Sequence, residues 1–464
     1  MLHYRLQAVV LLGLGLASTF GSGSLYADDT PPDSARRAPD RFQGLMEINP
    51  PAAPADNSLI AIEGATLLDG RGGQPIADSV VLIEGDRILA AGPREAIEIP
   101  QQAERVQAQG MTVMPGLLDA HLHVGSGQRL LDTTSLFLAH GVTSFRDPGR
   151  QYDIYEVLPQ STEPRPRCFA TGPHFDQPPP AYPDNSVLLS SAGEARDTVN
   201  RFVEQGATVV KVYFRLPLDL IRATCETAHA HGIPVTAHLE LIDADQAIAA
   251  GLDGIEHITS LGTCLAEPQA AEAFRQAVDA ENDARREGRF ALWADLDFSS
   301  PRVSPLLDVL VKRSVFICPT LAVFERRDGR PDVTLAQVRG FQNMMEFVGL
   351  CSQAGALLVT GSHTSSAYIP KGWAYQRAMQ LLVESGLSPM EVITASTWNN
   401  ALFLGCHERL GSLEKGKLAD LILVEGQPHE DIRAMYDIRR VMLGGNWISG
   451  TPSDPVPPAQ RNVP

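Results

Sequence analysis

The feature that most constrains the fold of this chain is the alternation of short apolar segments with longer helical segments through its middle. Short apolar segments, each typical of a buried strand, lie at residues 208–214, 234–238, 254–257, 315–319 and 356–361. Such alternation indicates parallel strands joined by crossover helices. Sustained over roughly 250 residues or more, it predicts an α/β fold of the (β/α)8 type, the TIM barrel.

Both ends of the chain carry a different pattern, in which short strands are separated by glycine turns. These segments lie at residues 59–70, 79–92, 418–426 and 440–448. Because the pattern lies on either side of the alternating region, we expect one small β-domain, of the β-sandwich type, built from both chain ends.

The first residues have the pattern of a secretory signal. His3 and Arg5 precede an apolar core at residues 8–17, which is too short to span a bilayer. Leu25, Tyr26 and Ala27 then form an acceptable cleavage site. We therefore expect export to the periplasm or out of the cell, and the length of the core disfavours the alternative of a short membrane anchor.

These patterns divide the chain into five expected segments. They are a signal peptide (residues 1–27), a leader (28–56), the first part of the β-sandwich domain (57–113), a (β/α)8 barrel (114–405), and the second part of the β-sandwich domain with a C-terminal tail (406–464).

Charge and cysteine content exclude several partner classes. The formal net charge is −17, whereas nucleic acids and anionic membranes are bound through basic surfaces. We expect neither of those partners and no stable membrane insertion. The six cysteines are dispersed without a Cys-x-x-Cys pair, which argues against a cysteine metal cluster. Assembly into a homo-oligomer stays open.

Two histidines, His121 and His123, close an apolar run that begins at Val113. Side chains two residues apart in a strand point the same way, so both imidazoles lie on one face. Neutral imidazole binds zinc and similar ions, and the pair is therefore a candidate metal site. Taken alone, the pattern also fits solvent-facing histidines or one buried structural histidine.

Three further residues end apolar strand segments downstream, namely Lys211, His238 and His257. Strand ends of a barrel meet at the same face, where the chemistry of this fold is located. A buried ammonium beside metal ions is unfavourable, but a neutral lysine reacts with carbon dioxide to give an anionic carbamate. Together with the histidine pair, these residues form one coherent metal site.

The chain resembles the amidohydrolase superfamily, and within it the imidazolonepropionase-like group that includes Xaa-Pro dipeptidase-like enzymes. The resemblance covers almost the whole chain after the signal peptide. It rests on segments 114–123, 210–213, 237–238, 255–257, 395–405 and 411–423.

The resemblance implies a ligand set. His121 and His123 would hold the more buried metal, and His238 with His257 the second, with carboxylated Lys211 as the bridge. One or two divalent metal ions are expected, with zinc as the first choice and other ions open. Two such ions, about 3.5–4 Å apart, share a hydroxide and polarise the scissile carbonyl.

One position departs from the family pattern. The superfamily has an aspartate after the last barrel strand, and His363 occupies that position here. No Asp or Glu occurs from Phe347 to Val383, so a register shift cannot supply one. Two divalent ions carry a total charge of +4. With a neutral His363, the carbamate and the hydroxide supply −2, whereas with an aspartate the three anions would supply −3. Metal binding should weaken or fall to one ion, yet histidine still ligates metals and transfers protons. We therefore assign His363 as both metal ligand and catalytic residue.

The candidates for substrate contact are fewer. Tyr213 lies two residues after Lys211 and should face the same side. His174, Arg215 and Tyr368 are further candidates, and a cation among them would suit a substrate carboxylate. The charged, helical segment Glu267–Arg289 is an insertion that either caps the active site or forms an ordinary surface helix.

The leading prediction is a secreted, metal-dependent amidohydrolase that cleaves a small amide, either a dipeptide (Xaa-Pro included) or an N-acyl amino acid. Cyclic amides and lactones stay open, because a fold does not fix its chemistry. A catalytically impaired homologue that binds a ligand or partner is the main alternative, and it rests on His363. Lys211 argues against a mononuclear deaminase, since the resemblance implies no bridging lysine there.

Overall fold

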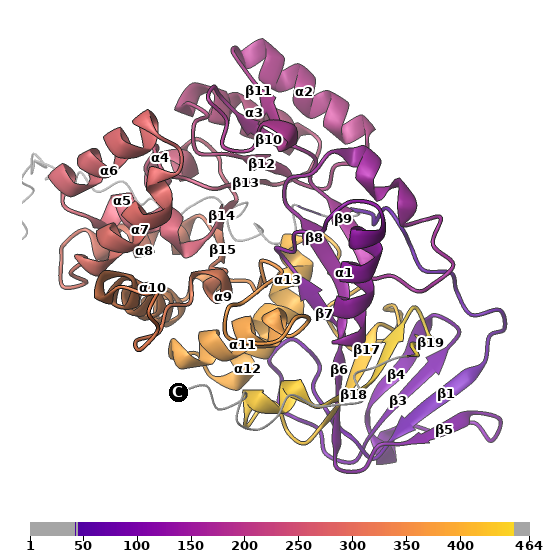
Figure 1. Ribbon diagram of the computed structural model, residues 1–464. Coiled ribbons are helices and arrows are strands. Elements are labelled where there is room, and N and C mark those ends of the chain that lie inside the picture. Colours follow the sequence, from indigo (N-terminus) through magenta and orange to yellow (C-terminus); the bar gives the residue numbers. More distant parts are fainter. Residues whose placement is uncertain (1–41, 43–44, 450–464) are drawn as a thin grey trace, which may run out of the picture.

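The computed structural model describes residue 42 and residues 45–449, which form an α/β part and a smaller β part (Figure 1). The predicted signal peptide, most of the predicted leader as far as residue 44, and the chain after residue 449 lie outside the described residues. No helix in the described part is long and apolar enough to cross a membrane.

Parallel strands form the centre of the α/β part. One sheet has seven strands in the order β11-β10-β12-β13-β14-β15-β16, and a second has the order β7-β8-β9. The strands are β7 (Leu117–Asp119), β8 (Val142–Asp147), β9 (Arg167–Ala170), β10 (His174–Asp176), β11 (Ser186–Leu188), β12 (Val210–Val212), β13 (Val235–Ala237), β14 (Gly254–Glu256), β15 (Phe316–Cys318) and β16 (Leu357–Leu358). The predicted α/β class with a parallel sheet is therefore confirmed.

Backbone hydrogen bonds also connect the two parallel sheets. The Ala120 N–H, just after β7, donates to the Thr360 carbonyl, just after β16, at 3.0 Å. The Thr208 N–H, just before β12, donates to the Ala170 carbonyl at the end of β9, at 2.9 Å. These two contacts lie at opposite edges of the three-stranded sheet.

Helices surround these sheets (Figure 1). They are α1 (Gln128–Ala139), α2 (Ala192–Glu204), α3 (Leu218–Ala230), α4 (Ala244–Ala249), α5 (Gly262–Leu265), α6 (Pro268–Ala280), α7 (Ala284–Ala294), α8 (Val303–Lys312), α9 (Leu321–Phe324), α10 (Leu335–Gln353), α11 (Ala374–Glu384), α12 (Pro389–Ser396) and α13 (Trp398–Phe403). Short 3₁₀ helices lie at Arg94–Ala96, Tyr152–Val157, Pro183–Asn185, Ile258–Leu261 and Ile432–Tyr436. Capping boxes begin α10 at Thr334 and α12 at Ser388, and each cap stabilises its helix by about 1 kcal/mol.

The small β part contains two sheets, in the orders β4-β3-β1-β5 and β19-β18-β17-β6-β2. The strands are β1 (Leu59–Glu63), β2 (Thr66–Leu67), β3 (Ser79–Glu84), β4 (Arg87–Pro93), β5 (Glu104–Gln107), β6 (Met111–Pro115), β17 (Leu421–Glu425), β18 (Ile438–Leu443) and β19 (Asn446–Trp447). The antiparallel pair β6–β17 joins strands from the two ends of the chain. Apolar side chains of both sheets, among them Ile62 and Leu423, form one buried cluster.

Candidate metal centre

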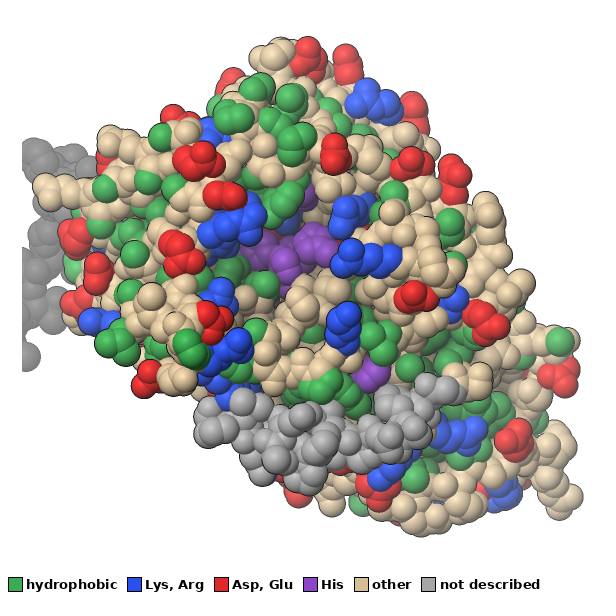
Figure 2. Space-filling model, viewed as in Figure 1, with side chains coloured by type: hydrophobic (Ala, Val, Ile, Leu, Met, Phe, Trp, Pro, Cys, Tyr) green, Lys and Arg blue, Asp and Glu red, His purple; other side chains and the backbone are tan. Residues whose placement is uncertain are grey.

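A cavity of about 440 Å³ opens at the carboxyl ends of the parallel strands. Figure 2 shows histidine side chains at the bottom of a hollow in this face. Seven residues singled out from the sequence line the cavity, namely His123, His174, Lys211, Tyr213, His238, His257 and His363. His121 lies directly beneath, fully buried, with its ring centroid 4.7 Å from that of His257.

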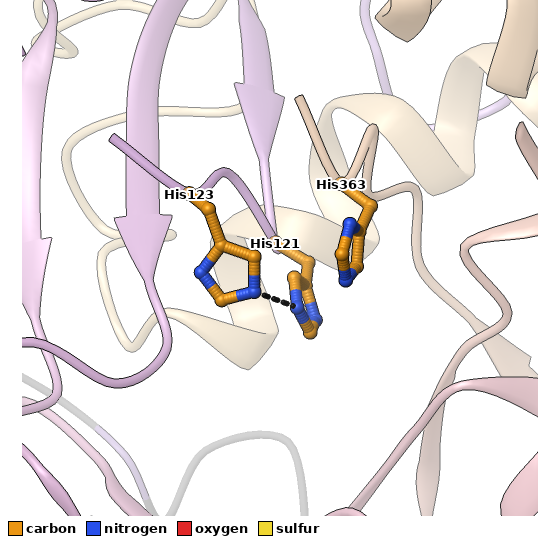
Figure 3. Close-up of side chains that lie close together, drawn as sticks. All are labelled: His121, His123 and His363. Carbon is orange, nitrogen blue, oxygen red and sulfur yellow. Dashed lines mark hydrogen bonds between the residues drawn. The ribbon is translucent and has the colours of Figure 1, made fainter. Parts of the chain in front are cut away.

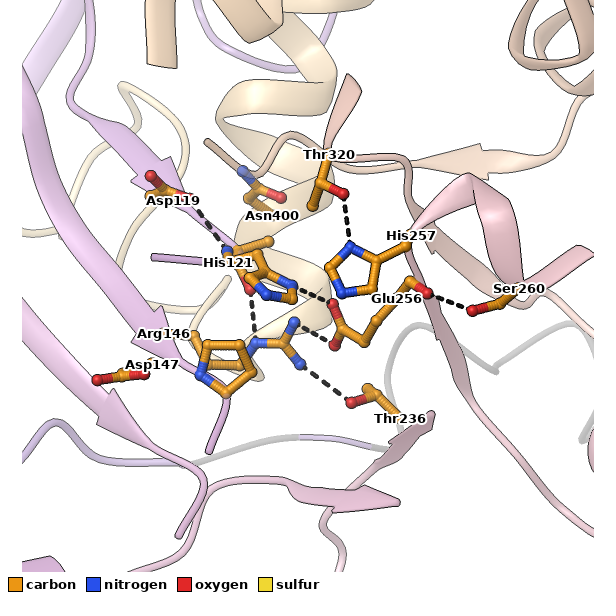
Figure 4. Close-up of polar contacts among 12 residues, drawn as sticks. Asp119, His121, Arg146, Asp147, Thr236, Glu256, His257, Ser260, Thr320 and Asn400 are labelled. Carbon is orange, nitrogen blue, oxygen red and sulfur yellow. Dashed lines mark hydrogen bonds and ion pairs between the residues drawn. The ribbon is translucent and has the colours of Figure 1, made fainter. Parts of the chain in front are cut away.

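His121 follows β7 and is held by a carboxylate on another strand (Figure 4). Its Nδ1 lies 2.7 Å from Oε2 of Glu256, at the end of β14. A carboxylate only accepts a hydrogen bond, so Nδ1 carries the proton and the Nε2 lone pair faces the cavity. The carboxylate thus sets the tautomer that a metal ligand needs.

The other strand-end histidines are oriented by the same principle. Nδ1 of His123 lies 3.3 Å from Oδ1 of Asp147, and Nδ1 of His257 lies 2.7 Å from Oγ1 of Thr320. His238 is arranged the other way, with Nε2 2.8 Å from Oε1 of Glu240. Its Nδ1 is buried and has no hydrogen-bond partner among the described residues. Each histidine therefore keeps one nitrogen for a ligand.

The histidine nitrogens without an oxygen partner have a spacing that suits a divalent cation. Nε2 of His121 and Nε2 of His123 lie 3.1 Å apart (Figure 3). If both rings carry their protons on Nδ1, two lone pairs face each other, which is favourable only around a cation. Two imidazoles on tetrahedral zinc, with bonds of 2.0–2.1 Å, place their nitrogens about 3.3 Å apart. The donor set therefore fits a metal ion.

Burial keeps these rings in the ligand form. Desolvation lowers the pKa of His121, His238 and His257 well below the ordinary value, and the nearby Lys211 lowers each of them further. The imidazoles are neutral at physiological pH as a result, and neutral imidazole is the form that binds metals.

Lys211 lies in β12 and is 1% exposed. Burial lowers the pKa of its ammonium to about 8, against the opposing effect of Glu256. About a tenth of the Lys211 side chains are therefore uncharged amines at pH 7, against fewer than about one in a thousand for an ordinary lysine. An amine in that state is the nucleophile required for carbamate formation.

Sequence reasoning missed Glu256 and its partner Arg146. The Arg146 guanidinium, from β8, lies 2.5 Å from Oε1 of Glu256 and 2.6 Å from the Ala120 carbonyl (Figure 4). Both charged residues are fully buried. Strand alternation predicts that Glu256 and His257 face opposite sides, but His257 has φ 64° and turns the backbone so that both reach the interior. A glutamate within an apolar strand was the one available signal.

His363 lies beside the histidine pair. Its N–H donates to the His121 carbonyl at 2.8 Å, and its ring stacks on that of His121 with centroids 5.0 Å apart. Ligand nitrogens of His121, His123 and His363 lie within 4.8 Å of one another. Gly361 permits this approach, because a Cβ there would lie 2.7 Å from Cβ of His121.

A second potential ligand group consists of His121, Glu256 and Cys318. It is the weaker candidate, because the Glu256 oxygens already bind His121 Nδ1 and Arg146. Burial also raises the pKa of the Cys318 thiol well above its ordinary value, so the thiolate that a metal needs is disfavoured.

Two of the predicted substrate contacts lie in the cavity and two lie outside it. His174 stacks on Tyr213 with ring centroids 4.7 Å apart, and both line the wall. Arg215 instead binds Asp279 and the carbonyl of Val278 at the end of α6. The Tyr368 hydroxyl accepts a hydrogen bond from the Arg327 N–H, away from the cavity lining.

The predicted insertion forms two helices, α6 and α7, rather than one. The structure extends the helical part five residues beyond Arg289, to Ala294, since α7 packs on α10. Arg285 and Arg289 of α7 line the cavity. The insertion therefore contributes to the wall of the site.

The fold and the site together define an α/β protein with a histidine-rich candidate metal centre at the strand ends. Residues 112–448 match the amidohydrolase family, and the chain belongs to that family. The predicted class, a hydrolase acting on C–N bonds, is confirmed at this level. The chain is also similar to the ochratoxinase of Aspergillus niger, with 23% identity over 473 residues that cover 86% of this chain and 88% of the relative.

Solved structures share the fold. A Xaa-Pro dipeptidase with methionine bound in its active site has a TM-score of 0.65 and 19% identity, covering 85% of this chain and 100% of that one. The A. niger ochratoxinase has a TM-score of 0.65 and 18% identity, covering 84% of this chain and 96% of that one. Identities this low establish the likeness of fold alone.

Proposed function

We propose that this protein is a secreted, metal-dependent amidohydrolase that cleaves a small amide, either a dipeptide or an N-acyl amino acid. One observation carries the proposal: four histidines gather at one cavity beside a buried lysine, and each has an oxygen partner on one ring nitrogen, which leaves the other for a ligand. Secretion, to the periplasm or out of the cell, rests on the signal-like N-terminus of the sequence. Xaa-Pro dipeptides are among the candidates, because a Xaa-Pro dipeptidase shares the fold.

The donor set supports the following assignment of metal ligands. His121 and His123 would hold one divalent ion, and His238 with His257 the other, with Lys211 as a carbamate between them. Zinc is the first choice, because imidazole nitrogens and an anionic oxygen suit it. When bound, such ions polarise the scissile carbonyl and lower the pKa of water.

His363 supplies the proton transfer that an aspartate supplies elsewhere in the superfamily. Burial holds the pKa of its imidazole well below the ordinary value, so the ring is neutral, which is the form in which a histidine nitrogen can accept a proton. The proton taken from the attacking water then passes to the nitrogen of the leaving amine, which departs as the C–N bond breaks. Tyr213 and His174 form the wall against which the substrate would lie.

The same proposal extends to the fold. Strands β7, β8, β9, β12, β13, β14, β15 and β16 make eight in ring order, and the hydrogen bonds from Ala120 and Thr208 would close the ring. A closed (β/α)8 barrel explains why side chains from β7, β12 and β14 converge. The shared apolar cluster of the small part favours a β-sandwich.

A catalytically impaired homologue is the second candidate, and His363 favours it. Its neutral ring leaves two divalent ions less compensated than a carboxylate would. Such a protein would bind amides without hydrolysing them.

Metal analysis combined with hydrolysis assays distinguishes these candidates. Protein purified with zinc should hold one or two equivalents and hydrolyse members of a panel of dipeptides and N-acyl amino acids. The His363→Ala variant should lose activity, and His363→Asp should retain it. If the native chain binds metal but cleaves nothing, while His363→Asp gains both metal and activity, the impaired homologue is the correct assignment.

A further inference from the structure

Within the proposed function, we propose that the substrate is a dianion, with one carboxylate bound by Arg285 and Arg289 of α7 and a second bound by Arg150 on the facing side of the cavity. The inference rests on the proposed function only in calling the ligand a substrate. The binding of two anionic groups is inferred from the residues that line the cavity.

The cavity is basic although the chain is acidic. Five arginines line it, against one acidic side chain, Glu287. The whole chain carries 38 basic and 55 acidic residues, so this local excess is opposite to the average. Figure 2 shows blue side chains gathered around the histidines. An anionic ligand is therefore favoured over a neutral or cationic one.

Arg285 is a buried cation that its surroundings satisfy only in part. It is 2% exposed, and its Nε has no hydrogen-bond partner among the described residues. Its nearest carboxylate, Asp283, lies 3.5 Å away, is 67% exposed, and also binds Arg286 at 2.8 Å. Burying a charge without full compensation is costly, and a ligand carboxylate would remove that cost.

Arg289 adds a second charge one helical turn away. Its Nε donates to the Arg285 carbonyl at 2.9 Å, and no ion pair of Arg289 occurs in the described part of the chain. Like charges four residues apart on a helix repel each other. Phe214 lies 5.6 Å from the Arg285 guanidinium and Phe324 lies 5.2 Å from that of Arg289, which forms apolar walls beside both. An anion between the two guanidiniums would offset the repulsion.

Arg150 supplies the third charge from another element. It follows β8, whereas α7 follows β14, and Figure 1 shows β8 and α7 on different sides of the strand ends. Its Nε is buried without a hydrogen-bond partner in the region described, and no ion pair of Arg150 occurs there either. Arg150 and His174 line the same cavity.

The residue type indicates carboxylates. A guanidinium presents a planar set of donors that matches a carboxylate in a two-pronged hydrogen bond. Two such sites on facing walls, with the metal ligands between them, fit an amide that has an acid group on either side of its scissile bond or at both ends of its amine part. N-acyl derivatives of acidic amino acids and dipeptides with an acidic residue belong to this class.

A series of three compounds of nearly equal shape tests the number of charges. N-acetyl-L-glutamate carries two negative charges, N-acetyl-L-glutamine one, and N-acetyl-L-glutamine amide none. Calorimetric titration into the zinc-loaded full chain should give dissociation constants that rise at least tenfold at each step. Equal affinity for all three compounds, or tightest binding of the neutral one, would overturn the proposal.

Variants assign each charge to its arginine. Arg289→Gln should lower one of the two preferences, glutamate over glutamine or glutamine over its amide, and Arg150→Gln should lower the other. Arg285→Lys keeps the charge in case Arg285→Gln does not fold, and it should give an intermediate loss. Arg339→Gln, on the exposed face of α10, is the matched control and should leave both ratios unchanged.

Binding and hydrolysis are scored separately. If the three compounds bind in the expected order but no amide is cleaved, the charge inference stands and the proposed hydrolase function fails. If amides are cleaved while the order is absent or survives all arginine variants, the charge inference fails and the hydrolase function stands.

Discussion

The floor and the rim of the cavity differ in how their polar groups are held. The floor consists of His121, His123, Lys211, His238 and His257, at strand ends. Each of its histidines has an oxygen partner on one nitrogen, at 2.7 to 3.3 Å. The rim consists of Arg150, Arg285 and Arg289, on a loop and a helix, and these side chains have few partners among the described residues.

This difference separates two tasks. A group with a fixed partner and tautomer presents the same atom to every ligand, which suits the chemical step. A charged group without full compensation gains most when a matching ligand arrives, which suits selection of the substrate. Changes to the floor should therefore abolish a property, and changes to the rim should alter a preference.

Removal of Lys211 should have the largest effect of any change to the floor. Lys211→Met should lower kcat/KM at least 1000-fold, about 4 kcal/mol, because the bridging anion is lost. Metal analysis should show fewer equivalents than in the native chain, and added bicarbonate should increase metal uptake in the native chain only. Lys312→Met, at an exposed ion pair on α8, is the control. Full activity of Lys211→Met would remove the carbamate from the proposal.

Loss of the Glu256 charge tests whether the oxygen partners keep the histidines of the floor in place. Glu256→Gln leaves the buried Arg146 guanidinium uncompensated, so the free energy of unfolding should fall by about 3 kcal/mol. Zinc affinity should fall roughly 10- to 100-fold, because His121 loses its carboxylate partner. Denaturant titration and metal competition measure the two effects. Glu272→Gln, on the surface of α6, should change neither.

Asp176 extends the comparison to a buried carboxyl behind the wall. Burial raises its pKa to about 6, and Oδ2 has no hydrogen-bond partner in the described region. The pKa of Asp176 is higher in the folded chain than in the unfolded chain. The contribution of protonated Asp176 to the free energy of unfolding is therefore present in full below about pH 4, and it is lost as the pH rises through 6.

Asp176→Asn should therefore be more stable than the native chain at pH 8, by about 3 kcal/mol, with no advantage at pH 4. The amide oxygen still accepts the Arg215 N–H, so the fold is retained. Thermal unfolding at both pH values measures this difference, with the exposed Asp184→Asn as the control. Equal stability of native and variant protein at pH 8 would contradict the raised pKa.

The smallest effect is expected at an arginine that already has partners. Arg215 binds Asp279, Asn282 and a main-chain carbonyl, and Asp279 is 72% exposed. Asp279→Asn should lower the free energy of unfolding by less than about 0.5 kcal/mol, as for exposed ion pairs generally. It should also leave ligand preference unchanged. A change in ligand preference would indicate that Arg215 acts in ligand selection together with the arginines of the rim.

The floor could be predicted from the sequence and the rim could not. His121, His123, Lys211, His238 and His257 each end an apolar strand, and the ends of parallel strands meet at one face whatever the details of packing. Arg285 and Arg289 lie on an inserted helix, whose orientation depends on its contacts with α10. The local sequence pattern does not predict those contacts.

Two other features were missed or misplaced for backbone reasons. Glu256 reaches the interior only because His257 adopts a left-handed conformation, which breaks strand alternation. Arg215 lies four residues after Lys211, beyond the end of β12, where the strand period no longer gives its direction. Both cases show that side-chain direction becomes unpredictable at the exact point where a strand ends.

The pairing of β6 with β17 has a consequence for the order of assembly. Gly116 alone separates β6 from β7, so the strand that leads to His121 and His123 is continuous with a strand whose partner is Leu421–Glu425. During synthesis that partner emerges after every other residue of the floor. The site should therefore reach its final geometry only once the chain is nearly complete, and a nascent or truncated chain that ends before β17 should neither retain metal nor resist proteolysis.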